Sequence, residues 1–166
     1  FKVMDRRQFI HSSVCAGASL ALLPAELQAE TIKKTGLAEV YKDSFKLGTA
    51  ISTNTLSGKN PSILDLIARE FNAITAENAM KWNSIHPSHD RWNWGLCDQF
   101  VSFGRANSML MIGHTLVWHK QTPPSLFKDR GKLISPKKLY KRLENHISTV
   151  VDRYKTYIAV WDLSLI

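Results

Sequence analysis

The chain has 166 residues, is 44% hydrophobic and 22% charged, and carries a formal net charge of +8 at pH 7. This composition excludes a disordered or collagen-like chain, and the length suits one globular domain of ordinary size. The positive charge is compatible with a nucleic-acid-binding surface, but Lys and Arg are scattered apart from one cluster at Lys137, Lys138, Lys141 and Arg142. We therefore interpret the charge as a solvated basic helix surface and expect no nucleic-acid partner.

The first 29 residues are typical of an export signal. Arg6 and Arg7 precede Phe9, an apolar stretch follows at 14–23, and the small residue Ala29 suits a cleavage point. The paired arginines resemble a twin-arginine signal, and an ordinary secretory signal is the alternative. The apolar stretch is too short for stable membrane insertion. We predict that residues 1–29 comprise three residues of upstream readthrough and a signal peptide that starts at Met4, that residues 30–166 form the domain, and that the bacterial protein is periplasmic or secreted.

The cysteine and histidine patterns predict neither a disulfide framework nor a metal site. Cys97 is the one cysteine after the predicted signal, and the histidines lack the spacing of a zinc-binding motif. We expect no cofactor, so the stability of the domain must come from its core.

Strands and helices alternate along the rest of the chain, after a polar lead-in at 30–44. Apolar runs predict strands at 45–51, 71–75, 109–115 and 157–161, separated by loops at 52–60 and 77–94. Helices are predicted from Pro61, from Leu96 to Asn107 and from Ser135-Pro136. The apolar face of the last helix is expected at Leu139, Leu143, Ile147 and Val150. This order predicts βαβ units and an α/β fold with a parallel sheet.

Polar side chains follow the second predicted strand at the point where it ends. Glu77, Asn78 and Lys81 supply an acceptor, an amide and an ammonium group within one helical turn. A helix-capping arrangement is the alternative explanation, which we favour less. In parallel α/β folds, however, the loops after the carboxyl ends of the strands form the binding face. Such groups suit a polyhydroxylated ligand, because each sugar hydroxyl both donates and accepts.

A second polar group follows the third predicted strand, within the apolar stretch at 112–121. His114, Trp118 and Gln121 lie there, and buried polar groups cost free energy unless they are hydrogen-bonded. Trp118 offers an apolar face for a sugar ring, although core filling is its ordinary use. If the strand runs this far, alternation places His114 and Trp118 on the same face.

Three segments resemble signature segments of glycoside hydrolase family 10, the retaining endo-β-1,4-xylanases. They are TAENAMKW at 75–82, GHTLVWHKQ at 113–121 and the shorter IAVWD at 158–162. The resemblance implies the first half of a (β/α)8 barrel that hydrolyses the xylan backbone, with xylan or xylo-oligosaccharides as partners. It also implies that the glycone side of the cleft is lined by Glu77, Asn78, Lys81, His114, Trp118 and Gln121.

The chain departs from the family pattern at several positions. Ala79 replaces an acidic residue, and an aromatic residue is expected close to Leu126. The acid/base glutamate is expected at 166 after an asparagine at 165, where Leu165 and Ile166 stand. The nucleophile belongs to the second half of the barrel. Since retaining hydrolysis needs two carboxylates about 5–5.5 Å apart, we predict no catalytic residue in this chain.

The departures lead us to expect a xylanase precursor cut short by a frameshift or premature stop, inactive alone and prone to aggregation because its sheet edges are open. A non-catalytic xylan-binding remnant is the alternative function, and a basic nucleic-acid binder ranks third.

Overall fold

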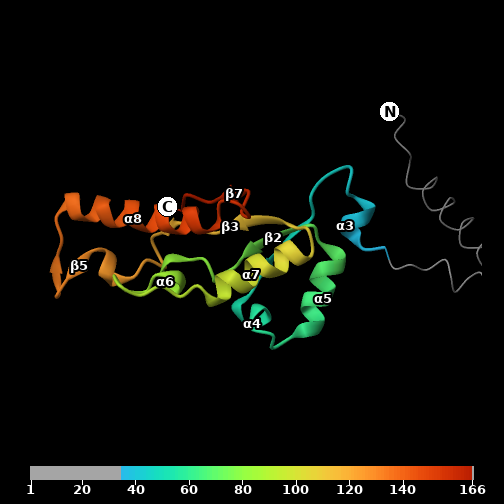
Figure 1. Cartoon of the computed structure of the whole chain (residues 1–166), viewed down its shortest axis with the longest axis horizontal. Helices are drawn as coiled ribbons and strands as arrows, with labels where there is room; N and C mark the ends of the chain where they lie inside the picture. The colour runs from blue at the N-terminus through green and yellow to red at the C-terminus, as the bar shows by residue number, and fades with distance from the viewer. Residues whose placement is uncertain (1–34, 166) are drawn as a thin grey trace, which may run out of the picture. The chain divides into compact units, whose positions relative to one another are not determined.

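Four short parallel strands form the centre of the structure (Figure 1). The computed structural model describes residues 35–165, so the predicted signal peptide and the prediction for Ile166 lie outside the described residues. The strands lie in the order β1-β2-β3-β7. Their bounds are β1 (Gly48–Ile51), β2 (Ala73–Ala76), β3 (Leu110–Gly113) and β7 (Val160–Trp161). The predicted parallel sheet is confirmed.

Three longer helices alternate with these strands: α5 (Pro61–Glu70), α7 (Gly95–Ala106) and α8 (Pro136–Tyr154). Pro61 and Pro136 each lie at the start of a helix, as predicted, because proline has no N–H to leave unpaired there. The Ser135 hydroxyl caps α8 by accepting a hydrogen bond from the backbone N–H of Lys138 at 3.4 Å. Figure 1 shows α7 beside β2, and Val150 of α8 is buried in the same hydrophobic core as Ile74 and Met111 of the sheet.

The buried face of α8 differs from the one predicted. Of the four predicted apolar residues only Val150 is buried, and the buried row instead includes Arg142, His146 and Tyr154. Arg142 is 8% exposed, so the interpretation of its cluster as fully solvated was wrong at this residue. Its guanidinium is drawn inward because it donates to the carbonyl of Ser125 at 2.6 Å. A hydrophobic pattern does not reveal a polar group that the fold satisfies internally.

Several short elements lie where loops or a continuous strand were predicted. The loop at 52–60 contains α4 (Thr53–Leu56), and the loop at 77–94 contains α6 (Trp82–Ile85). β3 ends at Gly113, and the next strand, β4 (Val117–Trp118), pairs with β8 (Ser164–Leu165). The strand-long alternation predicted for 112–121 was therefore wrong, because the backbone N–H of Leu116 is bonded to Asp162 instead of continuing the β3 ladder.

The remaining short elements are α3 (Leu37–Val40), η1 (Pro124–Leu126) and the antiparallel pair β5 (Lys128–Asp129) and β6 (Lys132–Leu133). Within residues 35–165, no helix is both long and apolar enough to cross a bilayer.

The two faces of the sheet differ in how well they are covered. Ile74 and Met111 pair in register and are buried with the α7 residue Phe100 in the hydrophobic core. Such burial stabilises the fold by about 1.5–3 kcal/mol for each large side chain. The neighbouring row runs from Ala50 through Thr75 and Ile112 to Val160 and stays partly or fully exposed. This second face and the carboxyl ends of the strands carry the candidate site.

Candidate functional site

A hollow of about 440 Å³ lies on the open face of the sheet. Its floor comes from β1 and from Thr75 near the end of β2. Glu77, Lys81 and His114 complete its lining. Three of the six predicted binding residues are thus brought together around one hollow, as the parallel topology predicts.

His114 is held by a carboxylate that the sequence analysis did not include among the site residues. Gly113 pairs with Trp161 in the parallel ladder, so the next residues, His114 and Asp162, lie side by side. His114 Nδ1 lies 2.8 Å from Asp162 Oδ2. The carboxylate favours the proton on Nδ1, which leaves Nε2 as a hydrogen-bond acceptor while the ring is neutral. The sequence signal that could have identified this carboxylate is the position of Asp162 directly after the fourth predicted strand.

Lys81 links three of the predicted residues. Its ammonium group donates to the Asn78 side-chain oxygen at 3.0 Å and lies 4.5 Å from the centroid of the Trp118 ring. Lys81 is only 7% exposed and takes part in no ion pair among residues 35–165. A buried ammonium needs partners, and these two contacts leave some of its three N–H donors for a ligand.

The helix-capping alternative for the residues after β2 is not what the structure shows. Lys81 occupies the N-cap position of α6 and makes no side-chain cap hydrogen bond. Glu77 is exposed, with its backbone N–H bonded to the Ile51 carbonyl at 3.1 Å. Its carboxylate is therefore accessible from solvent at the rim of the hollow.

Gln121 does not line the hollow. Its backbone N–H donates to the Trp118 carbonyl at 3.2 Å, and its own carbonyl accepts from the backbone N–H of Asn83 at 2.9 Å. These bonds tie the loop after β3 to α6. A ligand contact by the half-buried Gln121 side chain stays a prediction.

Five rings, beginning with Trp82 directly after Lys81 in the sequence, form what we call the aromatic stack: Trp82, His86, Trp92, Trp94 and His146. Trp82 stacks on His146 with ring centroids 3.6 Å apart, and His86 stacks on Trp92 at 3.7 Å. The two imidazoles meet edge to edge, with 3.2 Å between their Nδ1 atoms. Trp94 extends the stack at 4.8 Å from Trp92.

Burial sets the charge of the two stacked histidines. Desolvation, together with the smaller effect of the nearby His86, lowers the pKa of His146 to about 3. Desolvation also lowers the pKa of His86. Both rings are therefore neutral near pH 7, which allows one Nδ1–H to donate to the other Nδ1. The sequence analysis missed this stack because its members are separated by up to 64 positions.

Two other chemistries lack support in the described part of the chain. Burial raises the pKa of the Cys97 thiol to about 12, and its Sγ donates to the Ala79 carbonyl at 3.1 Å, so this thiol is a poor nucleophile. Among residues 35–165, no group of three or more His, Cys, Asp or Glu side chains could hold a metal ion. The hollow is instead suited to hydrogen bonding, with acceptors at Glu77 and His114 and donors at Lys81 and Thr75.

Residues 36–164 match the model of Glycosyl hydrolase family 10. An endo-1,4-beta-xylanase/feruloyl esterase of Xylanibacter ruminicola is 41% identical over 129 residues, which cover 77% of this chain and 18% of that protein. The solved structure of an endoxylanase of this family from a sugarcane soil metagenome is 45% identical, with a TM-score of 0.75, over 78% of this chain and 39% of that one.

A mutant structure in complex with xylotriose is 35% identical, with a TM-score of 0.68, over 76% of this chain and 38% of that one. The chain thus spans about two fifths or less of the length of these relatives. Their agreement with β1, β2, β3 and β7 confirms that the strands form the first half of a (β/α)8 barrel.

Proposed function

The chain belongs to glycosyl hydrolase family 10, and from that premise we propose that it serves xylan hydrolysis by holding the sugar on the glycone side of the cleaved bond. The proposed activity of the whole protein is that of an endo-1,4-beta-xylanase, and the proposed ligands are xylan and xylo-oligosaccharides. The observation that carries the proposal is the convergence of Glu77, Lys81 and His114 on one hollow.

The chemistry of the hollow supports a neutral, polyhydroxylated ligand. A carboxylate, an ammonium and an imidazole that is oriented by Asp162 offer both acceptors and donors to sugar hydroxyls. Trp118 lies beside Lys81, and one similar structure is a complex with xylotriose. Residues 77, 78, 81, 114, 118 and 121 are the proposed substrate contacts.

We expect this chain alone to bind xylo-oligosaccharides without cleaving them. Retaining hydrolysis requires one carboxylate as nucleophile and a second as acid and base. Among residues 35–165, Glu77 is the carboxylate that lines the hollow, and Asp162 is hydrogen-bonded to His114. The resemblance assigns Glu77 to sugar hydroxyls, which leaves no carboxylate pair for the bond-breaking step.

Calorimetric titration of the 166-residue chain with xylotriose tests the binding. We expect saturable binding that Trp118→Ala weakens at least tenfold. Tyr140→Ala is the matched control, because Tyr140 is an aromatic side chain on α8 that is 72% exposed and lies outside the hollow. Absence of xylotriose binding, or equal loss in both variants, would contradict the proposed site. Release of reducing sugar from xylan by this chain would contradict its proposed inactivity.

Export is a separate proposal, supported by Arg6 and Arg7 ahead of the apolar stretch at 14–23. Residues 1–29 fused to a folded reporter should carry it into the bacterial periplasm. Changing both arginines to lysine should retain the reporter in the cytoplasm if the twin-arginine route is used. Unchanged export of that variant would favour an ordinary secretory signal instead.

A further inference from the structure

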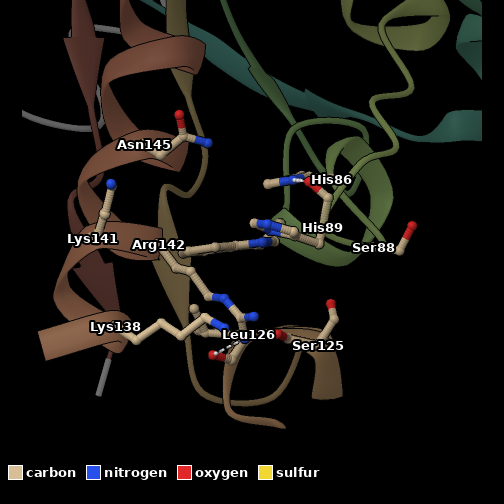
Figure 2. A pocket seen from close by; sticks show the side chains of 10 residues that line it. His86, Ser88, His89, Ser125, Leu126, Lys138, Lys141, Arg142 and Asn145 are labelled. Carbon is tan, nitrogen blue, oxygen red and sulfur yellow. Dashed lines mark hydrogen bonds between the residues drawn. The ribbon is translucent and has the colours of Figure 1, made fainter. Parts of the chain in front are cut away.

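A second cavity, of about 340 Å³, lies between α8 and the loop that follows α6 (Figure 2). We call it the α8 pocket. It shares no lining residue with the hollow described above. Figure 2 shows the side chains of Lys141 and Arg142 on one side of the pocket and those of His86 and His89 on the other. Its volume is within the range of sites for small organic ligands.

One wall of the α8 pocket is apolar and fixed in place. Trp82 and Leu126 line it and are 3% and 4% exposed, and the His86 ring adds a further flat surface. Trp82 and His86 also belong to the aromatic stack, where His146 and Trp92 hold their rings. Because these rings are already ordered, a ligand that packs against them incurs little further loss of side-chain entropy.

The opposite side of the pocket is positively charged. Lys138, Lys141 and Arg142 line it, and one carboxylate, Asp129, forms ion pairs with both Lys138 and Arg142. Lys141 takes part in no ion pair among residues 35–165. Positive charge therefore exceeds negative charge at this rim, and the rim attracts an anion.

Arg142 provides a second, independent indication of an anionic ligand. It is more than nine-tenths buried, and its Nε–H has no hydrogen-bond partner among the described residues. The rest of the guanidinium donates to the carbonyls of Ser125, Leu126 and Lys128 and to the carboxylate of Asp129. A buried cation whose donors are not all satisfied is stabilised by a nearby anion, because the effective dielectric constant is low there.

We propose that the α8 pocket binds a small aromatic monocarboxylate. The ring of such a ligand packs against Trp82 and Leu126, and its carboxylate faces Lys141 and Arg142. Inorganic phosphate satisfies the cations but leaves the apolar wall unfilled, and a neutral sugar supplies no negative charge for the cations and no aromatic ring for the wall. This proposal does not rest on the function proposed for the hollow.

Tryptophan fluorescence and calorimetry of the full chain, with sodium benzoate as the probe, test the proposal. We expect saturable binding that weakens as ionic strength rises. Benzamide, which has nearly the same shape without the charge, should bind at least tenfold more weakly. Inorganic phosphate should not displace benzoate at equal concentration, and xylotriose should not compete with it.

Two charge variants on the same helix make the test specific. Lys141→Gln should weaken benzoate binding by fivefold or more. Lys137→Gln, which removes an exposed lysine that does not line the pocket, should leave the affinity unchanged. Both lysines are exposed, so neither change is expected to affect folding. The proposal is overturned if benzoate does not bind, if benzamide binds equally well, if phosphate displaces benzoate, or if both variants behave alike.

Discussion

The loop after β2 has two halves that differ in environment. Its first half, 77–81, presents Glu77 and Lys81 to the hollow, and Glu77 remains exposed to solvent. Its second half, 82–94, places Trp82 and His86 in the aromatic stack, where both are buried. The first half therefore has polar groups that can form further hydrogen bonds, and the second half is held by stacking between aromatic rings.

The difference shows how exposed binding groups can be held in place. Parallel ring pairs contribute about 0.5–1.5 kcal/mol each beyond the burial of their area. The His86–His146 contact joins the loop to α8 across 60 positions of sequence. The second half therefore anchors the loop, and the first half can leave its polar groups available to a ligand. Four predictions test this division.

The largest effect is expected from His146→Ala. His146 is fully buried and contacts both Trp82 and His86. Its removal leaves a cavity and an unpaired imidazole, so we expect the free energy of unfolding to fall by about 3–5 kcal/mol. Urea denaturation measures the change. His89→Ala is the control, because His89 is exposed and should cost less than about 0.5 kcal/mol. A similar small loss in both variants would contradict the anchoring role of the stack.

The second prediction concerns the free energy of unfolding at acidic pH. The folded-state pKa of His146 is about 3, far below its ordinary value of 6.5, and that of His86 is also lowered. The unfolded chain therefore binds more protons than the folded one below pH 6.5, and stability is lost as the pH falls through this range toward 3. Below pH 6 the slope approaches about 1.4 kcal/mol per pH unit for His146, and the lowered pKa of His86 adds to it.

Urea midpoints between pH 7 and 5 measure this slope, since the ordinary carboxylates stay mostly ionised there. His146→Phe keeps a ring against Trp82 without a titrating group, so below pH 6 its slope should be smaller than that of the unchanged chain by about 1.4 kcal/mol per pH unit. His89→Gln should keep the full slope. A His146→Phe chain with an unchanged slope would show that other groups cause the acid sensitivity.

The third prediction addresses the first half of the loop. Glu77→Gln removes the charge of an exposed carboxylate and should change the free energy of unfolding by less than about 0.5 kcal/mol. Xylotriose affinity should fall about tenfold or more, because a hydrogen bond to a charged group contributes about 1.5–3 kcal/mol. Calorimetry measures the affinity, with the exposed Glu144→Gln on α8 as the control. Loss of stability without loss of affinity would reverse the roles of the two halves.

The smallest effect is expected at the edge of the stack. The Arg153 guanidinium lies 4.6 Å from the Trp94 ring centroid and pairs with Asp98 at 2.8 Å, and both charged side chains are more than 40% exposed. Solvent screens such pairs, so Arg153→Met should cost less than about 1 kcal/mol in thermal or urea unfolding. A loss of more than about 2 kcal/mol in the free energy of unfolding would indicate that the contacts of Arg153, and not those of the stacked histidines, hold the loop in place.

The features that could be predicted from the sequence are those that depend on local residue patterns or on the parallel order of the strands. Apolar periodicity located the four strands and three long helices, and the rule for strand ends brought Glu77, Lys81 and His114 together. The sequence analysis did not locate the end of β3 at Gly113. The apolar and polar residues continue to alternate after Gly113, but the backbone N–H of Leu116 donates to the Asp162 carbonyl and leaves the β3 ladder.

Long-range contacts were also beyond the sequence analysis. A histidine after α6 and another on α8 have no local pattern that pairs them, so the aromatic stack could not be predicted. The inward turn of Arg142 depends on carbonyl groups near η1, 16 and 17 positions earlier in the chain. Such contacts depend on tertiary packing and not on local propensity.

The pair Trp92 and Trp94 has an optical consequence. The two indoles are nearly parallel, at 5°, with centroids 4.8 Å apart. Indoles held this close in one fixed arrangement lie in an ordered and asymmetric environment, which gives them circular dichroism bands in the near ultraviolet. Loss of fixed side-chain packing removes such near-ultraviolet signals while secondary structure can remain. The chain thus contains its own spectroscopic reporter of whether the loop after β2 is packed, without any added label.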